Sequence, residues 1–132
     1  MMRVYKTRRF ARLARKASIS DNSLFEAVSR ADRGLVDAHI GRFLIKQRIA
    51  RGGKGRSGGY RAVLFFRSGE MSVFLDCFAK SLKANLTVAE EGLLRMLADQ
   101  ISEMHAMDER EAVRAGEWIE VEYGENEAQI PK

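Results

Sequence analysis

The residues best suited to chemistry lie in one window of the chain, from Arg42 to Arg67. This window contains no Asp or Glu, and its eight cationic residues are Arg42, Lys46, Arg48, Arg51, Lys54, Arg56, Arg61 and Arg67. Five glycines between residues 51 and 59 allow the backbone to adopt positive φ and to approach a ligand closely. A surface with this concentration of cations favours a polyphosphate ligand.

Cations of this kind can cleave RNA without a further cofactor. The 2′-hydroxyl of RNA is itself the nucleophile, so a protein must orient the backbone, remove one proton and donate another. Arginines can hold the nonbridging oxygens as negative charge develops on the phosphorus centre. A lysine with cationic neighbours loses its proton more readily and can act as a base, and Lys46 has Arg48 and Arg61 as expected neighbours. The same residues can also simply bind phosphate, and composition does not separate the two roles.

Two strands are expected to position these cations. Residues 43–50 and 60–67 are rich in β-formers, and the glycine-rich loop 51–59 joins them. Side chains alternate between the faces of a strand, so Lys46 and Arg48 share one face. Antiparallel pairing of the two strands then brings Lys46, Arg48 and Arg61 onto one surface.

The remaining elements predict an α+β fold. Helical spacing indicates a hairpin of two helices over about residues 8–33, and a longer helix that begins near residues 85–87. Two pairs have the spacing of a capping box, Ser23 with Glu26 and Thr87 with Glu90. Further strands are expected at residues 3–7, 35–40, 71–80 and 119–123, and residues 108–115 are expected to extend the long helix. Short links between consecutive strands favour an antiparallel meander.

The strand at 71–80 is expected to alternate without interruption. Met71, Val73, Leu75 and Cys77 then face one side, whereas Ser72, Phe74, Asp76 and Phe78 face the other.

Charge is distributed unevenly along the chain. Residues 1–67 carry 17 Lys or Arg against four Asp or Glu, whereas residues 68–132 carry six against 14. A basic half of this kind suggests a nucleic acid or another polyanion as partner. The length of 132 residues fits one domain, with residues 1–107 as the domain and 108–132 as an acidic extension.

Several other classes find no support in the sequence. No apolar run reaches the length of a membrane span, the N-terminus lacks a secretory signal, and the single cysteine, Cys77, fits a reducing cytoplasm. Two histidines and one cysteine without ligand spacing give no metal site, and no nucleotide-binding glycine motif is complete, so no cofactor is expected. No nucleophile or metal ligand lies at a characteristic spacing from the pair Asp37 and His39, so His39 is expected to be a structural or surface histidine.

One segment of the chain resembles a known family. Residues 46–61 follow the pattern K-x-R-x-A-R-x-G-K-G-R-x-G-G-x-R, and Phe78-Ala-Lys80, Asn85-Leu-Thr87 and Tyr5-Lys-Thr-Arg-Arg-Phe10 add to it. Over about residues 3–105 the chain resembles toxins of the RelE/ParE superfamily of bacterial type II toxin–antitoxin systems, in the HigB-like RelE branch.

This resemblance implies a fold, an activity and a site. The fold is a twisted, mainly antiparallel sheet packed by an N-terminal helical hairpin and a C-terminal helix. The activity is metal-independent cleavage of mRNA on translating ribosomes in the cytoplasm, which a cognate antitoxin holds inactive. The implied site comprises Lys46 or Lys54 for proton transfer, Arg48, Arg51, Arg56 and Arg61 for phosphate, and Lys80 as a further cation. Many relatives have a tyrosine near the end of the last strand, where this chain has Phe78, which can stack on a base but cannot donate a proton.

Two other functions remain open at this stage, and oligomeric state is not predicted. ParE-like relatives poison DNA gyrase by binding, and a plain phosphate- or DNA-binding module would have the same composition. The glutamate-rich segment 117–127 is expected to pair along a sheet edge, to fold over the basic site, or to act as a solubilising tail.

Overall fold

The computed structural model describes residues 2–50, 59–82 and 85–122. The elements in chain order are β1 (Arg3–Thr7), α1 (Arg8–Ala17), α2 (Asp21–Asp32), β2 (Ala38–Gly41), β3 (Leu44–Ile49), β4 (Tyr60–Arg67), β5 (Met71–Ala79), α3 (Val88–Ser102), α4 (Ala106–Arg114) and β6 (Trp118–Glu120). None of the helices in these ranges is both long enough and apolar enough to cross a membrane.

The six strands form one open sheet in the order β2-β3-β4-β5-β1-β6. The antiparallel meander from β2 to β5 is confirmed. β1 is parallel to β5, and β6 is antiparallel to β1. The strand expected at residues 35–40 begins only at Ala38, because the segment before it hydrogen-bonds to side chains of β3 instead of continuing the ladder.

The helical hairpin is confirmed as α1 and α2. Thr87 and Glu90 form the expected capping box of α3. The capping box expected from Ser23 and Glu26 is wrong, because Ser20 is the residue that caps α2. Ser20 accepts a hydrogen bond from the backbone of Ser23. The expected extension of the long helix is also wrong, since α3 ends at Ser102 and α4 is a separate helix.

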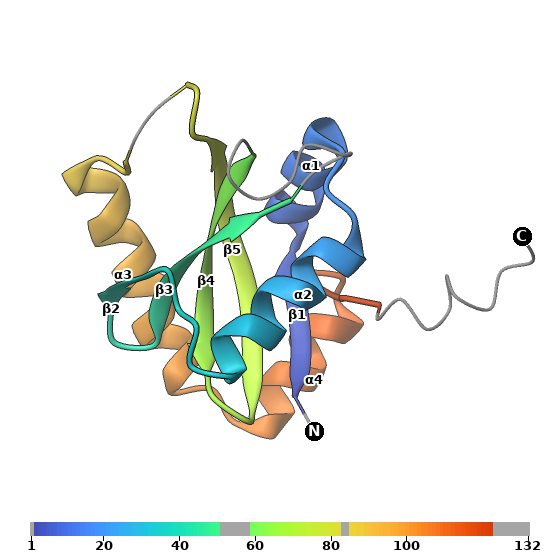
Figure 1. The fold of residues 1–132 in the computed structure, drawn as a ribbon. Coiled ribbons are helices and arrows are strands. Elements are labelled where there is room, and N and C mark those ends of the chain that lie inside the picture. The colour runs from blue at the N-terminus through green and yellow to red at the C-terminus, as the bar shows by residue number, and fades with distance from the viewer. Residues whose placement is uncertain (1, 51–58, 83–84, 123–132) are drawn as a thin grey trace, which may run out of the picture.

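Each face of the sheet carries its own core (Figure 1). α1 and α2 pack on one face through buried residues such as Phe10, Leu24 and Val28. α3 and α4 pack on the other face, where Leu94, Ala98, Ile101 and Ala112 meet the strands. Figure 1 shows α2 crossing in front of the sheet while α4 lies behind it.

A β-bulge corrects the expected alternation of β5. The register of β4 against β5 shifts between Val63 and Leu64, so one strand gains a residue relative to the other. Met71, Val73 and Leu75 share a face, as expected, and lie in the core under α3. Cys77 was expected on the same face but packs with the α1–α2 core. Phe78 lies instead in the α3 core. The extra residue reverses the facing of every side chain that follows it.

The C-terminal elements are tied to the first strand. β6 pairs with β1 at the edge of the sheet opposite β2, and Trp118 packs on Tyr5 with ring centroids 5.4 Å apart. Glu109 of α4 accepts hydrogen bonds from Arg3 Nε at 2.6 Å and from the Tyr5 hydroxyl at 2.5 Å. Residues 106–121 therefore pack with the rest of the fold, although they straddle the boundary expected at residue 107. Glu120 lies in β6, at the edge of the sheet opposite β2, whereas Glu125 and Glu127 of the glutamate-rich segment lie outside the described residues.

The contacts of Glu109 predict a pH-dependent stability. Burial disfavours the charged form of Glu109, but the hydrogen bonds from Arg3 and Tyr5 outweigh it and hold the pKa of the carboxyl below 4.5. A carboxyl with a lowered pKa in the folded state stabilises the fold above its unfolded pKa, and this stabilisation is lost as the pH falls through the folded pKa. Glu109→Gln is expected to lower the free energy of unfolding by about 2 kcal/mol at neutral pH. Urea denaturation should show this difference shrinking as the pH is lowered below about 5.

Glu111→Gln is the matched control on the same helix. Glu111 pairs with Arg114 at 2.8 Å, but both side chains are exposed. Its replacement is expected to change stability by less than about 0.5 kcal/mol. An equal loss in the two variants would show that the contacts of Glu109 contribute nothing specific.

Candidate polyanion-binding site

The cations predicted to share a surface do share one. In the ladder between β3 and β4, Arg48 lies directly opposite Arg61, and Lys46 lies opposite Val63. Arg61 is in turn opposite Phe78 of β5. Arg48, Arg61 and Phe78 therefore form a row across three strands, which we call the arginine row, with Lys46 two residues from Arg48 on the same face.

Arg61 is held in the middle of the arginine row with an unsatisfied donor. Its Nη1 atom is buried and has no hydrogen-bond partner among the described residues. A buried N–H without a partner costs on the order of 1–3 kcal/mol. Two like charges directly opposite each other in a ladder also destabilise a sheet. Arg61 is thus in a position that folding alone does not favour and that an anion would satisfy.

Lys46 reaches the segment in front of α3. Its Nζ atom donates a hydrogen bond to Oδ1 of Asn85 at 3.2 Å. Within the described ranges Lys46 forms no ion pair, so a neutral amide orients its amine and leaves the charge uncompensated. The site therefore includes Asn85, which the sequence suggested only as the opening of a helix.

Arg48 has an acidic neighbour. Its Nη2 atom lies 3.2 Å from Oδ1 of Asp37, and its backbone N–H donates to Oδ2 of the same carboxylate at 2.7 Å. Burial disfavours the charged form of Asp37, but the hydrogen bonds and charge of Arg48, with the charge of Arg30, outweigh it and lower the pKa of the carboxyl below 3.8. Asp37 therefore stays ionised beside the cations.

The end of β5 supplies the last two described candidates. Lys80 is exposed and follows directly after β5, at the end of the sheet where β3 ends and β4 begins. Phe78 is only 8% exposed and packs in the core under α3. Its packing in this core is established, whereas a stacking role on a base stays a prediction. Lys54, Arg51 and Arg56 lie outside the described residues.

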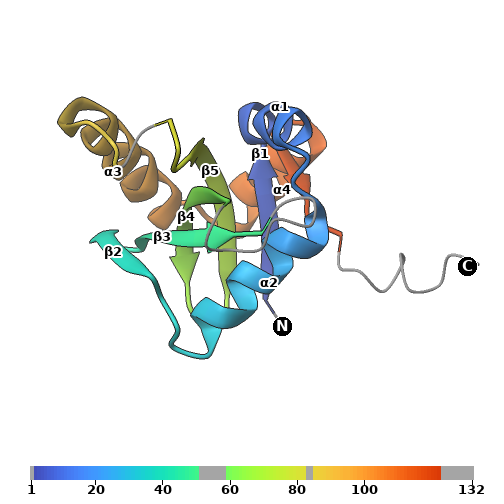
Figure 2. The ribbon, with the colours of Figure 1, turned by 45° about the horizontal axis from the view of Figure 1, so that its top comes forward.

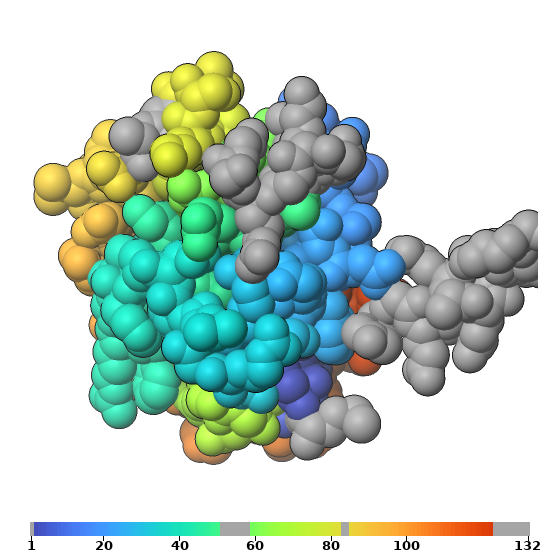
Figure 3. Space-filling model, viewed as in Figure 1, coloured from blue at the N-terminus to red at the C-terminus, as the bar shows by residue number. Residues whose placement is uncertain are grey.

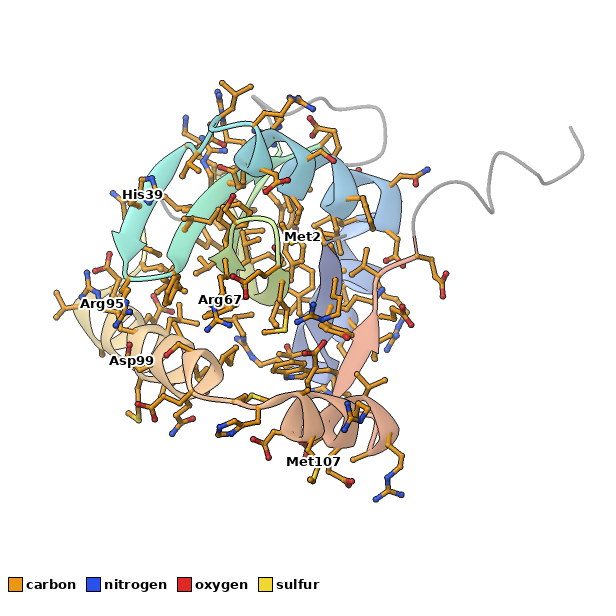
Figure 4. The ribbon with its side chains drawn as sticks, turned by 90° about the horizontal axis from the view of Figure 1, so that it is seen from below. Met2, His39, Arg67, Arg95, Asp99 and Met107 are labelled. Carbon is orange, nitrogen blue, oxygen red and sulfur yellow. The ribbon has the colours of Figure 1, made fainter. Side chains whose placement is uncertain are left out.

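Two cations of the sequence window serve the fold at the opposite end of these strands. Arg67 lies over the rings of Phe43 and Phe65, at 5.1 and 5.3 Å, and donates a hydrogen bond to the backbone of Ser102 at 2.9 Å. Arg42 lies 4.9 Å from the ring of Phe43. Figure 4 shows Arg67 beneath the sheet, facing α3, and His39 out on the edge strand β2. His39 is exposed, as expected for a superficial histidine.

The surface also has an apolar hollow, which none of the described candidate cations lines. It has a volume of about 390 Å³ and lies between α1, β5 and α3, which Figure 2 shows on either side of the end of β5. Half of its lining residues are leucines. Its carboxylates already have partners, since Asp76 pairs with Arg9 at 3.0 Å and Glu90 belongs to the capping box of α3. Among the described residues no group of three or more His, Cys, Asp or Glu side chains could hold a metal ion. The cationic face of β3 and β4 is therefore the candidate site.

The comparison with family models assigns the chain to one group of proteins. The model described as the RelE toxin of the RelE/RelB toxin–antitoxin system matches residues 2–121. The chain belongs to the RelE toxin family. It is thus the toxin of a toxin–antitoxin module, and an antitoxin is its partner. A comparison with curated proteins found no match.

The family match also bears on the extent of the resemblance. It runs to residue 121 and so includes α4 and β6, beyond residue 105, where the resemblance read from the motifs ended. The RelE assignment is confirmed, and the HigB-like branch stays a prediction.

Three residues that contact the candidate site were not predicted from the sequence. Asn85, Asp37 and the buried Arg30 contact Lys46 or Arg48 from segments 10 or more positions away along the chain. Asp37 was considered only with His39, whose side chain lies on the exposed edge. The available signal was that Asp37 is the only acid between residues 33 and 67, since an acid among many cations has a strong tendency to pair.

Proposed function

We propose that this RelE toxin cleaves mRNA on translating ribosomes, without a metal ion, at the surface formed by Lys46, Arg48 and Arg61. The observation that supports this most is the arginine row, in which two cationic side chains face each other across a ladder. Such an arrangement is unfavourable in the free protein and favourable when a phosphate lies between the charges.

The reaction needs only groups of this kind. The 2′-oxygen of one nucleotide attacks the adjacent phosphorus, a new 2′-O–P bond forms, and the bond from phosphorus to the 5′-oxygen of the next nucleotide breaks. One proton leaves the 2′-hydroxyl and one proton joins the departing 5′-oxygen. Negative charge develops on the nonbridging oxygens between these events, and Arg61 with Arg48 would stabilise it.

Lys46 is the described residue best placed to transfer a proton. Its amine is oriented by Asn85 and lies on the same face as the arginine row. Lys54 and Lys80 are further candidates for proton transfer or charge stabilisation. Lys80 directly follows β5, at the end of the sheet where β3 ends. Phe78 cannot donate a proton, so the lysines carry the acid–base steps in this scheme.

Primer extension on a reporter mRNA in a purified translation system tests the proposal. The full-length toxin is expected to produce new cuts that need translating ribosomes and that weaken on Lys46→Ala by about 10²-fold or more. Arg33→Ala, which removes an exposed arginine at the end of α2, is the control and should cut as the unaltered chain does.

The other outcomes distinguish the alternatives. Cuts in naked RNA at the same rate would contradict ribosome dependence while supporting the ribonuclease. Intact mRNA together with gyrase-dependent breaks in supercoiled DNA would support a ParE-like gyrase inhibitor. Intact mRNA and intact DNA, together with binding of the protein to nucleic acid or phosphate, would support a binding module.

A further inference from the structure

A single carboxylate holds the end of β3 where Arg48 lies. Asp37 accepts two hydrogen bonds from Arg48. The backbone N–H donates to Oδ2 at 2.7 Å, and the guanidinium donates to Oδ1 at 3.2 Å. One side chain thus fixes both the main chain and the charged end of Arg48. β2 begins one residue later, at Ala38, so this carboxylate takes the place of a ladder partner at the edge of the sheet.

The carboxylate is itself anchored from behind by Arg30 of α2. The Arg30 side chain is only 5% exposed, and it donates to Asp37 Oδ2 at 3.3 Å and to Glu26 at 2.8 Å. It also donates to the backbone oxygen of Arg48. Both backbone polar groups of Arg48 are therefore held by this network, which connects them to a helix on the other face of the sheet.

The main chain of Asp37 is fixed as well. Gln47, which is fully buried, accepts the backbone N–H of Asp37 through Oε1 at 2.6 Å. The amide nitrogen of Gln47 donates to the carbonyls of Ala27 at 2.9 Å and Leu35 at 3.3 Å. Figure 3 shows α2 and the segment leading to β2 packed side by side on this face. A satisfied buried network of this kind restricts the position of its members.

A structural role alone would not need an acid that reaches the exposed guanidinium. Arg48 is 44% exposed at its side chain and faces Arg61 in the ladder, so its charge is repelled by its neighbour. Asp37 offsets this repulsion and keeps the Arg48 guanidinium beside the arginine row. The Arg48 side chain remains exposed beside this carboxylate, so its guanidinium is accessible to an anion.

We propose that Asp37 is a positioning residue, which sets the Arg48 guanidinium to bind an RNA phosphate and which is anchored by Arg30 and Gln47. This inference rests on the proposed function, because it takes RNA as the ligand. Asp37 affects RNA binding through the position of Arg48 and not through the net charge of the surface.

Asp37 could affect RNA binding through its charge alone or by positioning Arg48, and these two explanations predict opposite results for Asp37→Asn. This substitution removes a negative charge from the site, so electrostatics alone predicts tighter RNA binding. Positioning predicts binding about tenfold weaker, because the charge-assisted contact to Arg48 is lost. The measurement is fluorescence anisotropy of a labelled single-stranded RNA of mixed sequence with the full-length protein, across a range of salt concentrations.

A double-mutant cycle with Arg48→Ala decides whether Asp37 acts through Arg48. Asp37→Asn is expected to weaken RNA binding in the unaltered chain and to have no further effect once Arg48 is alanine. The slope of RNA affinity against salt concentration should also become shallower by about one phosphate contact, to the same extent in Arg48→Ala and in Asp37→Asn. Equal losses in both backgrounds, or tighter binding by Asp37→Asn, would overturn the proposal.

Two further variants keep the test decisive. Asp32→Asn is the matched control, because Asp32 accepts the backbone N–H of Gly69 at 2.9 Å in the turn at the opposite end of β4, and its loss should not weaken RNA binding. Asp37→Glu keeps the charge but displaces the carboxylate by one methylene, so it should also weaken binding, and it replaces Asp37→Asn if the latter does not fold. An unaltered chain that does not bind RNA would refute the proposed function itself, whereas RNA binding with additive losses refutes only the role of Asp37.

Discussion

Arg61→Met is expected to reduce mRNA cleavage on the order of 10²- to 10³-fold while leaving the protein folded. Arg61 lies at the centre of the arginine row, between Arg48 on β3 and Phe78 on β5. Methionine keeps an unbranched stem of similar length but has no charge and no donor. The loss should appear in kcat as well as in kcat/KM, because the charge that Arg61 would stabilise develops in the transition state. Single-turnover primer extension on programmed ribosomes measures it.

The same substitution is expected not to destabilise the fold. In the free protein Arg61 faces a like charge and has a buried Nη1 atom without a partner in the described part of the chain. Removing both features should leave the free energy of unfolding unchanged or raise it by about 1 kcal/mol. Such a gain in stability with a loss of activity is typical of residues that are kept for function.

Two results would contradict this account of Arg61. Cleavage by Arg61→Met within about threefold of the unaltered chain would exclude Arg61 from the chemistry. A marked fall in stability, measured by urea denaturation, would show that the arginine serves packing. Arg33→Met removes an exposed arginine and should alter neither property.

The sequence predicted the strands that carry the site because their pattern is local. Alternating β-formers on either side of a glycine-rich loop specify two neighbouring strands, so the pairing of Lys46, Arg48 and Arg61 followed from period and register alone. The antiparallel meander and the helical hairpin followed from short connections and helical spacing in the same way.

The facing of Phe78 was not predictable from the same reasoning. A bulge adds one residue to the ladder of β4 and β5, and no glycine or proline in β5 marks it. Strict alternation then assigns every later side chain to the wrong face. The arginine row acquires its third member only because of this irregularity, and irregular positions are often where function departs from local rules.

The network around Asp37 was also beyond local reasoning. Side chains of this network join three parts of the chain: α2, the segment before β2, and β3. Its hydrogen bonds connect residues up to 20 positions apart. Contacts at such separations depend on how the hairpin packs on the sheet. The single acid next to the cations was visible in the sequence, but its partner was not.

Truncation of the chain tests how far the domain extends. We expect that a chain that ends after residue 105 loses cooperative folding, whereas a chain that ends after residue 122 retains it. The shorter chain lacks α4 and β6, and with them Trp118, the contacts of Glu109, and the cover over Tyr5. Removing a buried tryptophan alone costs about 3–5 kcal/mol, which is a large part of the 5–15 kcal/mol by which a typical domain is stable. Urea denaturation followed by circular dichroism measures both chains.

This experiment contrasts the expected boundary at residue 107 with the family match, which runs to residue 121. Cooperative unfolding of the shorter chain would show that residues 108–132 are an appendage to an independent domain. Loss of folding would show that β6 completes the sheet, because β1 would otherwise keep an unpaired edge beside an exposed apolar face. Loss of cleavage in the shorter chain would then follow from unfolding, in contrast to Arg61→Met, in which cleavage is lost while the fold persists.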